Sequence, residues 1–521
     1  MGTEVIAVFW MVGLSCLVGL ATTAIRLRLS APGWLGVYAL VLVVDVAGWL
    51  LGWSAIVYLS AGMWVGLILL PVYLTVLGHR RVLQQRYAAA QRLTRFVSWL
   101  HPLDGYPHEP QLIHALELAQ RGEVAAATEI LQRFENVQSP IGMMAALTLY
   151  RITHRWQDVL AWQGAHPRQL ERNAAWMPAV LRAYGETGDV GGLVEFYDRH
   201  RRRIEKLAPA SSRDLCRLML FAFGGRPETV DRLLAGTMAD MPSLTQRFWR
   251  ATAKLSQGDA ETARREFEEL RPAADPMLQQ AIDRRLSQLA AVRPPLDQRA
   301  QDIVAEAERD HGHEETFAPR RSFFSRRARA TQLLIVLNVL MFALEMLRGG
   351  STRPEVLYHL GALYPPSVVA GQWWRLITAT FLHFGPFHLA MNMLALGFFG
   401  PFVEAALGRR RFVAVYLVAG VGSAATVLAF SLITGSTRMM VGGSGCVMGL
   451  IGASSALLLR GWMRHHARPA RRRLVTMLLM VGLQVVFDSL VPHVSMTAHL
   501  AGATIGFAAT LLLRDRLRGN T

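Results

Sequence analysis

The chain has 521 residues, of which 52% are hydrophobic and 18% are charged, and its mean hydropathy is +0.25. This composition is too apolar for an ordinary soluble protein, and the length allows several domains. We therefore expect an integral membrane protein. The formal net charge is +17, but no nucleic-acid-binding motif interleaves the arginines with stacking aromatic residues, so we expect no nucleic-acid partner.

Apolar residues gather in two separate parts of the chain, residues 1 to 78 and residues 329 to 514. The stretch between them is charged and reads as soluble. We predict an N-terminal membrane region at 1 to 78, a cytoplasmic helical-repeat domain at 79 to 292, a charged linker at 293 to 328, and a C-terminal membrane domain at 329 to 521. The predicted fold class is an all-α membrane protein.

The N-terminal region begins with an apolar run over residues 5 to 24. Because this run lacks the basic start of a signal peptide, we expect it to be a retained membrane span. Residues 34 to 78 have the length of two helices joined by a turn near Gly52 to Ser54. Three spans result, although a re-entrant or interfacial segment would serve nearly as well as one of them. Asp45 lies inside this region, and a functional role or burial against a neighbouring helix would explain it equally well.

The soluble block repeats a helix, turn and helix pattern at intervals of about 32 to 37 residues. The turns fall at Gly122, near His154, and at Gly188, Gly225 and Gly258. This period is similar to that of tetratricopeptide repeats, and it predicts a solenoid over about 108 to 292. A generic helical bundle is the alternative. Either fold would serve as a scaffold that recruits a cytoplasmic protein partner, because no catalytic motif is visible in it.

The C-terminal block contains six apolar segments close to the length of about 20 residues that a membrane span requires. They cover residues 331 to 347, 381 to 403, 411 to 434, 444 to 460, 473 to 491 and 497 to 514. Arginines gather before the first segment and after the second, fourth and sixth, whereas the loop at 435 to 443 has only Arg438 and the loop at 491 to 496 has none. By the positive-inside rule, the arginine-rich loops are cytoplasmic. We expect a multi-pass protein of a bacterial plasma membrane, with the soluble domain in the cytoplasm.

The three cysteines, Cys16, Cys216 and Cys446, lie in three different blocks. Their spacing excludes a disulfide framework and a zinc site, and we expect no metal and no cofactor. Although Cys446 lies two residues after Ser444, a cysteine in an apolar helix is first a small packing residue.

A Gly-x-Ser-Gly pattern stands at the start of the fourth segment of the C-terminal block, at Gly442 to Gly445. Ser444 there begins a helix, whose unpaired amide N–H groups and positive end can stabilise an oxyanion. The sixth segment carries His499, Gly502 and Gly506 at positions i, i+3 and i+7, hence on one helix face. Small residues on both segments, Gly445 with Gly449 and Gly502 with Gly506, predict a close approach of the two helices with His499 above the seam.

A further polar pair, His388 and Asn392, lies four residues apart at the start of the second segment. Both side chains therefore share a helix face and can donate hydrogen bonds to one developing negative charge. The second, fourth and sixth segments all begin on the outer side by arginine counting. His388, Ser444 and His499 are thereby expected at one side of the membrane. A helix-packing role for His388 and Asn392 is the alternative, but burying two polar groups without use is costly.

With these motifs, residues 329 to 514 resemble the rhomboid family of intramembrane serine proteases. The resemblance is carried by Gly442 to Gly445, by Ala498 to Gly502 with Gly506, by His388 to Asn392, and by Trp374-Arg375 in the first outer loop. It implies a six-helix core, a Ser-His dyad of Ser444 and His499, and an oxyanion hole formed by His388, Asn392 and the Ser444 amide. It also implies that the substrates are transmembrane helices in the lipid bilayer.

Several positions near these motifs receive other interpretations. Because the resemblance implies a dyad, Asp488 is interpreted as structural or loop-capping. Met448 replaces the aromatic residue that family members often place one turn after the serine to stack on the histidine. His383 and His493 are expected at solvated membrane edges, and Glu404 is expected to pair with the arginines that follow it. For Trp374 and Arg375, structural support of the outer loop and an ordinary interfacial anchor are equally supported.

Two other functions compete with proteolysis. A catalytically inactive rhomboid-like protein would bind or escort membrane proteins, but such proteins usually lose the nucleophile or the base, and this chain has both. A transporter would place charged or broken helices at mid-membrane in paired repeats, whereas these polar residues gather at one end.

Overall fold

The computed structural model describes residues 2 to 516, apart from 28–31, 105–107, 135–138, 168–175, 208–209, 290–295, 318–327 and 492–494. The regular structure of these residues is helical, and the only β pairing in the described part of the chain is an isolated bridge between Leu363 and Met440. The chain divides into two compact units. One contains residues 12 to 308, and the other contains residues 1 to 11 and 309 to 521.

The N-terminal apolar region forms the helices α1 (Thr3–Leu27), α2 (Pro32–Leu50) and a third continuous helix over Ser54–Leu83, made of α3 (Ser54–Trp64), a π-helical turn (Val65–Leu69) and α4 (Leu70–Leu83). The turn between the second and third lies at residues 51 to 53, as the sequence predicts. Asp45 is fully buried and accepts a hydrogen bond of 2.5 Å from Ser60 Oγ on the neighbouring helix. Its side chain is therefore part of the packing between α2 and α3.

The N-terminal apolar helices pack continuously against the helices that follow them. Helix α5 (Tyr87–Leu100) packs against both α4 and α6 (Glu109–Gln120). His101, just after α5, approaches the Leu67 carbonyl with Nε2 at 2.9 Å, and Asp104 accepts a hydrogen bond of 2.8 Å from the Gly33 amide. Residues 12 to 308 therefore form one unit, where the sequence suggests a boundary near residue 78.

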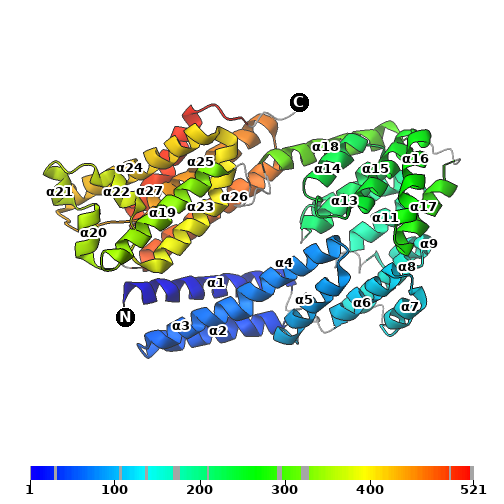
Figure 1. Ribbon diagram of the computed structural model, residues 1–521, viewed down its shortest axis with the longest axis horizontal. Coiled ribbons are helices and arrows are strands. Elements are labelled where there is room, and N and C mark those ends of the chain that lie inside the picture. Colours follow the sequence, from blue (N-terminus) through cyan, green and yellow to red (C-terminus); the bar gives the residue numbers. More distant parts are fainter. Residues whose placement is uncertain are drawn as a thin grey trace. The chain divides into compact units, whose positions relative to one another are not determined.

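The part of the chain for which the sequence predicts repeats, called the repeat region below, consists of consecutive helices (Figure 1). After α6 come α7 (Val124–Gln132), α8 (Pro140–Ile152), α9 (Trp156–Ala165), α11 (Met177–Thr187), α12 (Val190–Ile204), α13 (Ala210–Phe223), α14 (Pro227–Ala235), α15 (Ser243–Gln257), α16 (Ala260–Leu270) and α17 (Pro276–Ser287). All five predicted turn positions, Gly122, His154, Gly188, Gly225 and Gly258, have a left-handed backbone with φ between 55° and 105°. This conformation ends one helix and reverses the chain, and it favours glycine.

The interior of the repeat region holds a buried ionic cluster around Glu186 on α11. Its carboxylate accepts hydrogen bonds from Arg182 Nε at 3.2 Å and Arg285 Nη1 at 2.9 Å. Burial raises the pKa of Glu186, but the neighbouring Arg285 and Arg182 outweigh that effect and hold it below its ordinary value. The cluster joins α11 to α17, which are about one hundred residues apart in sequence.

Part of the predicted linker is helical. Helix α18 (Gln298–Phe317) occupies the middle of residues 293 to 328, and the boundary between the two units falls within it. Pro294 and Pro295 lie outside the described residues.

The C-terminal membrane domain contains six long apolar helices, one for each predicted segment: α19 (Arg329–Leu347), α23 (Gly385–Leu407), α24 (Arg409–Thr434), α25 (Ser444–His465), α26 (Arg468–Leu490) and α27 (Met496–Leu512). The first five satisfy the length and hydropathy of a membrane span, and α27 is a shorter apolar helix of 17 residues. With the three N-terminal helices, the described chain has eight candidate spans.

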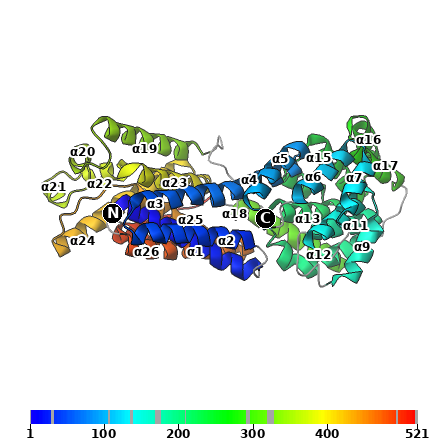
Figure 2. The same cartoon turned by 90° about the horizontal axis from the view of Figure 1, so that it is seen from below.

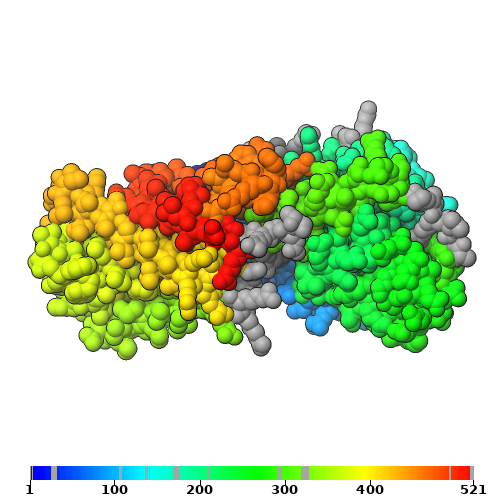
Figure 3. Space-filling view, turned by 90° about the horizontal axis from the view of Figure 1, so that it is seen from above, coloured from blue at the N-terminus to red at the C-terminus, as the bar shows by residue number. Residues whose placement is uncertain are grey.

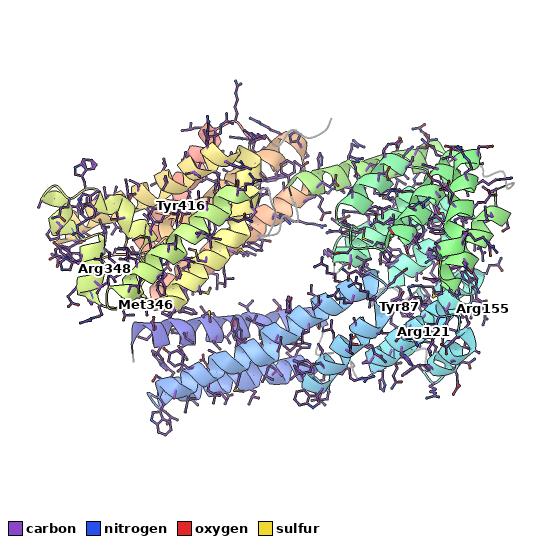
Figure 4. All side chains as sticks on the ribbon, viewed as in Figure 1. Tyr87, Arg121, Arg155, Met346, Arg348 and Tyr416 are labelled. Atoms are coloured by element: carbon purple, nitrogen blue, oxygen red, sulfur yellow. The ribbon has the colours of Figure 1, made fainter. Side chains whose placement is uncertain are left out.

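Helix α25 is the central element of this domain and packs against α23, α24, α26 and α27 (Figure 1). Its closest partner is α27, because glycines face glycines across the seam. A Cβ added at Gly502 would collide with the Gly445 carbonyl, and one at Gly506 would collide with the Gly449 backbone. Tyr416 of α24 is fully buried within the same bundle (Figure 4).

The connection between α19 and α23 forms the short helices α20 (Pro354–Leu360), α21 (Pro365–Val369) and α22 (Arg375–Thr378), which lie beside one another in Figure 2. Arg375 fastens this connection. It is 3% exposed, donates from Nη1 to the carbonyls of Tyr358 and Ala362 at 2.8 and 2.9 Å, and stacks over the Tyr358 ring. Trp374 is half exposed and lies beside the same guanidinium.

Glu404 forms the expected ion pair and has a second role, whereas His383 differs from the sequence expectation. Glu404 is buried and lies 3.8 Å from Arg409 Nε, and it also caps the start of α19 by accepting hydrogen bonds from the Ala330 and Thr331 amides at 3.0 and 2.9 Å. His383 is fully buried rather than solvated, and its amide donates to Glu345 at 2.9 Å. The carboxylates of Glu404 and Glu345 thus accept hydrogen bonds from backbone N–H groups that would be costly to bury unpaired. His493 lies outside the described residues.

Candidate active site

Ser444 is the first residue of α25 and is half buried. The preceding backbone is fixed by a hydrogen bond of 2.9 Å from the Gly442 amide to the Ala379 carbonyl, and the helix starts with the bond from the Val447 amide to the Gly443 carbonyl at 3.0 Å. The N-cap residue is Gly443, which offers no side chain to cap this first turn. The leading amide N–H groups of α25 are therefore oriented to bind an anion next to the Ser444 hydroxyl.

Gly442 makes room for His388 beside Ser444. Its φ is +134°, and a Cβ placed there would lie 2.7 Å from His388 Cε1, 3.0 Å from His388 Nε2 and 3.7 Å from Ser444 Oγ. The missing side chain thus leaves open the space between the imidazole and the hydroxyl. The structure brings His388 and Ser444 together from α23 and α25, which are separated by more than fifty residues.

Asn392 lies one turn after His388 on α23 and is 6% exposed. Its Nδ2 atom is buried without a hydrogen-bond partner among the described residues. An amide donor that no protein acceptor satisfies is costly unless a ligand uses it. This property suits a donor that stabilises a transient oxyanion.

His499 lies in the first turn of α27, whose start is capped by a hydrogen bond of 3.2 Å from the Ala498 amide to Ser495 Oγ. The residue as a whole is 7% exposed. One turn further along, Gly502 contacts Gly445, the residue after Ser444. The glycine seam therefore brings the starts of α25 and α27 together and places His499 at the same end of the bundle as Ser444.

Asp488 contacts His499 directly. Its Oδ2 atom lies 2.7 Å from His499 Nδ1, and its Oδ1 atom accepts a hydrogen bond of 2.7 Å from Gln484 Nε2. Asp488 is 7% exposed and comes from α26, which lies beside α27 on the surface in Figure 3. The interpretation of Asp488 as a structural or loop-capping residue is therefore corrected, since its carboxylate binds the candidate catalytic histidine.

Beneath Ser444, Cys446 is fully buried against the α24 backbone, next to Gly420. Its sulfur lies in the packed interior of the bundle, as expected for a small packing residue. Met448 is 4% exposed and belongs to the same apolar core.

Comparison with known protein families and curated proteins gives an independent view of the same region. Residues 370 to 516 match the family described as the Rhomboid domain. The chain is 33% identical to the rhomboid protease GluP of Bacillus subtilis over 183 residues, which is 35% of this chain and 34% of that protein. It is 34% identical to RHOMBOID-like protein 5 of Arabidopsis thaliana over 176 residues, which is 33% of this chain and 54% of that protein.

The chain covers a larger share of a shorter relative. The chain is 32% identical to the putative rhomboid protease YdcA of Bacillus subtilis over 152 residues, which is 29% of this chain and 71% of that protein. Of the longer relatives GluP and RHOMBOID-like protein 5, the chain covers between about a third and a half. The similarity falls on the C-terminal membrane domain, where Ser444, His499, His388 and Asn392 lie.

Proposed function

Because the chain belongs to the rhomboid family, we propose that it is an intramembrane serine endopeptidase that cleaves transmembrane helices near the outer face of the membrane. The observation that carries the proposal is the convergence of four polar residues from α23, α25 and α27 on one end of an apolar bundle. Relatives whose names describe them as rhomboid proteases support the same class of reaction.

In the proposed reaction, Ser444 is the nucleophile and His499 is first the general base and then the general acid. The Ser444 hydroxyl proton moves to His499 as Oγ bonds to the scissile carbonyl carbon, and the proton then passes to the leaving amine as the C–N bond breaks. Water next attacks the acyl-enzyme ester while His499 accepts its proton, and His499 then gives that proton to Ser444 Oγ as the C–Oγ bond breaks and the acid product leaves. Each step transfers one proton through the same imidazole.

The negative charge on the oxygen of the tetrahedral intermediate needs hydrogen-bond donors to stabilise it. His388, Asn392 and the Ser444 amide are proposed to supply them. Two observations support this assignment: the Nδ2 of Asn392 has no hydrogen-bond partner in the described part of the chain, and the N-cap residue of α25 is a glycine. Removal of one preorganised donor of this kind typically lowers the rate by about a hundredfold to a thousandfold.

The substrate is proposed to be a transmembrane helix with an easily unwound segment, because a peptide bond inside a helix presents its carbonyl to the helix and not to a nucleophile. The membrane is proposed to be a bacterial plasma membrane, with the arginine-rich loops and the helical repeats in the cytoplasm. Tetratricopeptide-like helix pairs are proposed to recruit a cytoplasmic protein.

The competing function is that of an inactive rhomboid-like protein that binds or escorts membrane proteins, with the repeats as the partner-binding scaffold. Retention of Ser444, His499 and the oxyanion donors in contacting elements favours proteolysis over this alternative.

The test uses the full-length protein reconstituted in liposomes with a labelled helical membrane substrate. We expect cleavage by the unaltered protein, and its abolition by Ser444→Ala and by His499→Ala. The matched control is Ser436→Ala in the exposed loop before α25, which should cleave normally. Cutting that persists in Ser444→Ala would rule out the assigned nucleophile, and binding without cutting by the unaltered protein would favour the escort function.

A further inference from the structure

Asp488 makes two hydrogen bonds that use both of its carboxylate oxygens. His499 Nδ1 lies 2.7 Å from Oδ2 and Gln484 Nε2 lies 2.7 Å from Oδ1. The same Gln484 nitrogen is 3.4 Å from His499 Nδ1, so both donors converge on one carboxylate. The side chain of Asp488 is fully buried, and that of His499 is 9% exposed.

These contacts determine which nitrogen of His499 carries the proton. An ionised carboxylate only accepts hydrogen bonds, so the neutral imidazole must carry its hydrogen on Nδ1 to bond with Asp488. The Nε2 lone pair is then free to accept a proton. A histidine without such a partner distributes itself between two tautomers, one of which has no lone pair on Nε2.

We propose that Asp488, held in place by Gln484, is a positioning residue that fixes the tautomer and ring orientation of His499 for proton transfer with Ser444. The inference rests on the proposed function and extends it, since the family resemblance implies a dyad. His499 becomes the middle member of a chain of contacts that starts at Gln484. Asp488 also faces the positive charge that His499 acquires when it takes the proton from Ser444.

The surroundings of Asp488 argue against a purely structural purpose. A carboxylate in a membrane-spanning helix is expensive and marks a functional pairing by default. Helix α26 is the least buried candidate span of the described chain, with 17% of its apolar window covered. Asp488 and Gln484 turn toward His499 from an otherwise sparsely packed helix.

The Asp488 contact also accounts for the departure at Met448. Family members often hold the imidazole with an aromatic residue one turn after the serine, and this chain has methionine there. Two short hydrogen bonds through Asp488 supply a directional restraint that a thioether does not. The sequence therefore replaces stacking with a charged acceptor.

The first test is Asp488→Asn in the full-length protein in liposomes, because asparagine keeps the shape and removes the charge. We expect kcat for cleavage to fall by about a hundredfold or more, with KM changed by less than about threefold. Gln484→Leu should cause a smaller loss, of about tenfold, because it releases Asp488 without removing it. The control Ser489→Ala removes an exposed neighbouring hydroxyl that donates to the Val485 carbonyl of its own helix, and it should leave kcat unchanged.

A second measurement asks whether Asp488 acts through His499. Labelling of Ser444 by a fluorophosphonate probe is timed in Asp488→Asn, His499→Ala and the double variant. We expect the double variant to react no more slowly than His499→Ala alone, because a positioning residue has no effect once its partner is gone. A further slowing of tenfold would show an independent role and overturn the proposal.

A third measurement needs no substitution. Nitrogen-15 NMR of histidine-labelled protein in detergent should show His499 with its hydrogen on Nδ1, and the signal is assigned by its loss in His499→Ala. A hydrogen on Nε2 in the unaltered protein would overturn the proposal. If the unaltered protein neither cuts nor reacts with the probe, the protease assignment fails. If it is active and Asp488→Asn keeps kcat within twofold, only the positioning role fails.

Discussion

The lack of a side chain at Gly442 allows the His388 imidazole to approach the Ser444 hydroxyl. We predict that Gly442→Ala lowers cleavage about a hundredfold, because the added methyl group would sit 2.7 Å from His388 Cε1 and displace it. The left-handed φ of +134° adds backbone strain of about 1–3 kcal/mol. Initial rates on the liposome substrate measure the effect.

The control for this substitution is Gly435→Ala. Gly435 also has a left-handed φ, of +68°, but a Cβ there has open space around it. This variant should lose thermal stability to a similar degree and keep its cleavage rate. Equal loss of activity in both variants would mean that strain alone, rather than the contact with His388, disables the protein.

Site residues that lie on the same helix could be predicted from the sequence, whereas contacts between different helices could not. His499, Gly502 and Gly506 share a face because helical periodicity alone determines it, and the same holds for His388 and Asn392. The contact between Asp488 and His499 joins two different helices, α26 and α27. The packing of α26 against α27 sets this contact, and no periodic pattern in the sequence encodes it.

Among the elements, the seam between α25 and α27 positions the proposed nucleophile Ser444 relative to the proposed base His499. We predict that Gly506→Val lowers the thermal stability of the membrane domain, with overpacking costing about 1–3 kcal/mol, and reduces cleavage. A Cβ at this position already collides with the backbone of Gly449, which cannot move as a flexible side chain would. Thermal unfolding in detergent, followed by exposure of the buried Cys446, measures the change.

The matched substitution is Gly482→Val on α26, where a side chain meets nothing within 4 Å. It introduces the same residue into a neighbouring membrane helix without a clash. We expect normal stability and activity, and a loss as large as that of Gly506→Val would show that the seam is not the sensitive element.

Helix positions followed from the sequence more closely than connections did. All five predicted turns of the repeat region have a left-handed backbone, since glycine and the end of helical periodicity mark such turns locally. By contrast, charges and prolines around residues 293 to 328 suggested a linker, yet α18 forms there. Its buried residues Val304 and Ala307 pack in the core of the repeats, a tertiary contact that composition does not reveal.

In the molecule as a whole, the stability of the repeat region depends on its buried charges. We predict that Glu186→Gln destabilises this unit by about 3–5 kcal/mol, because Arg182 and Arg285 are left without a buried counter-charge. Hydrogen exchange of residues 177 to 288 in the full chain measures the opening. The exposed pair Glu195 with Arg199 provides the control, and Glu195→Gln should cost less than about 1 kcal/mol.

The same cluster gives the repeat unit a pH dependence. The pKa of Glu186 in the folded protein is below its ordinary value, so the folded state is stabilised above the unfolded pKa. This stabilisation declines as the pH falls toward the folded pKa, where the carboxylate takes up a proton. Acid-induced opening should therefore shift to higher pH in Glu186→Gln, and an unchanged acid midpoint would contradict the role of the pair.

The orientation of the whole chain is tested with single cysteines in a background without native ones. Ser436→Cys, in the exposed loop before α25, should react with a membrane-impermeant maleimide in intact cells. Gln257→Cys, at the exposed end of α15, should react only after lysis. The reverse pattern would invert the proposed topology and place the site on the inner side.

Ser444 is proposed to be a nucleophile that is activated within the membrane domain. Covalent labelling of the protein by a fluorophosphonate, with the modified residue identified by mass spectrometry, tests this role. We predict modification at Ser444, slow or absent reaction in His499→Ala, and none at this position in Ser444→Ala. Failure of the folded, unaltered protein to react, or modification at another serine alone, would contradict the claim.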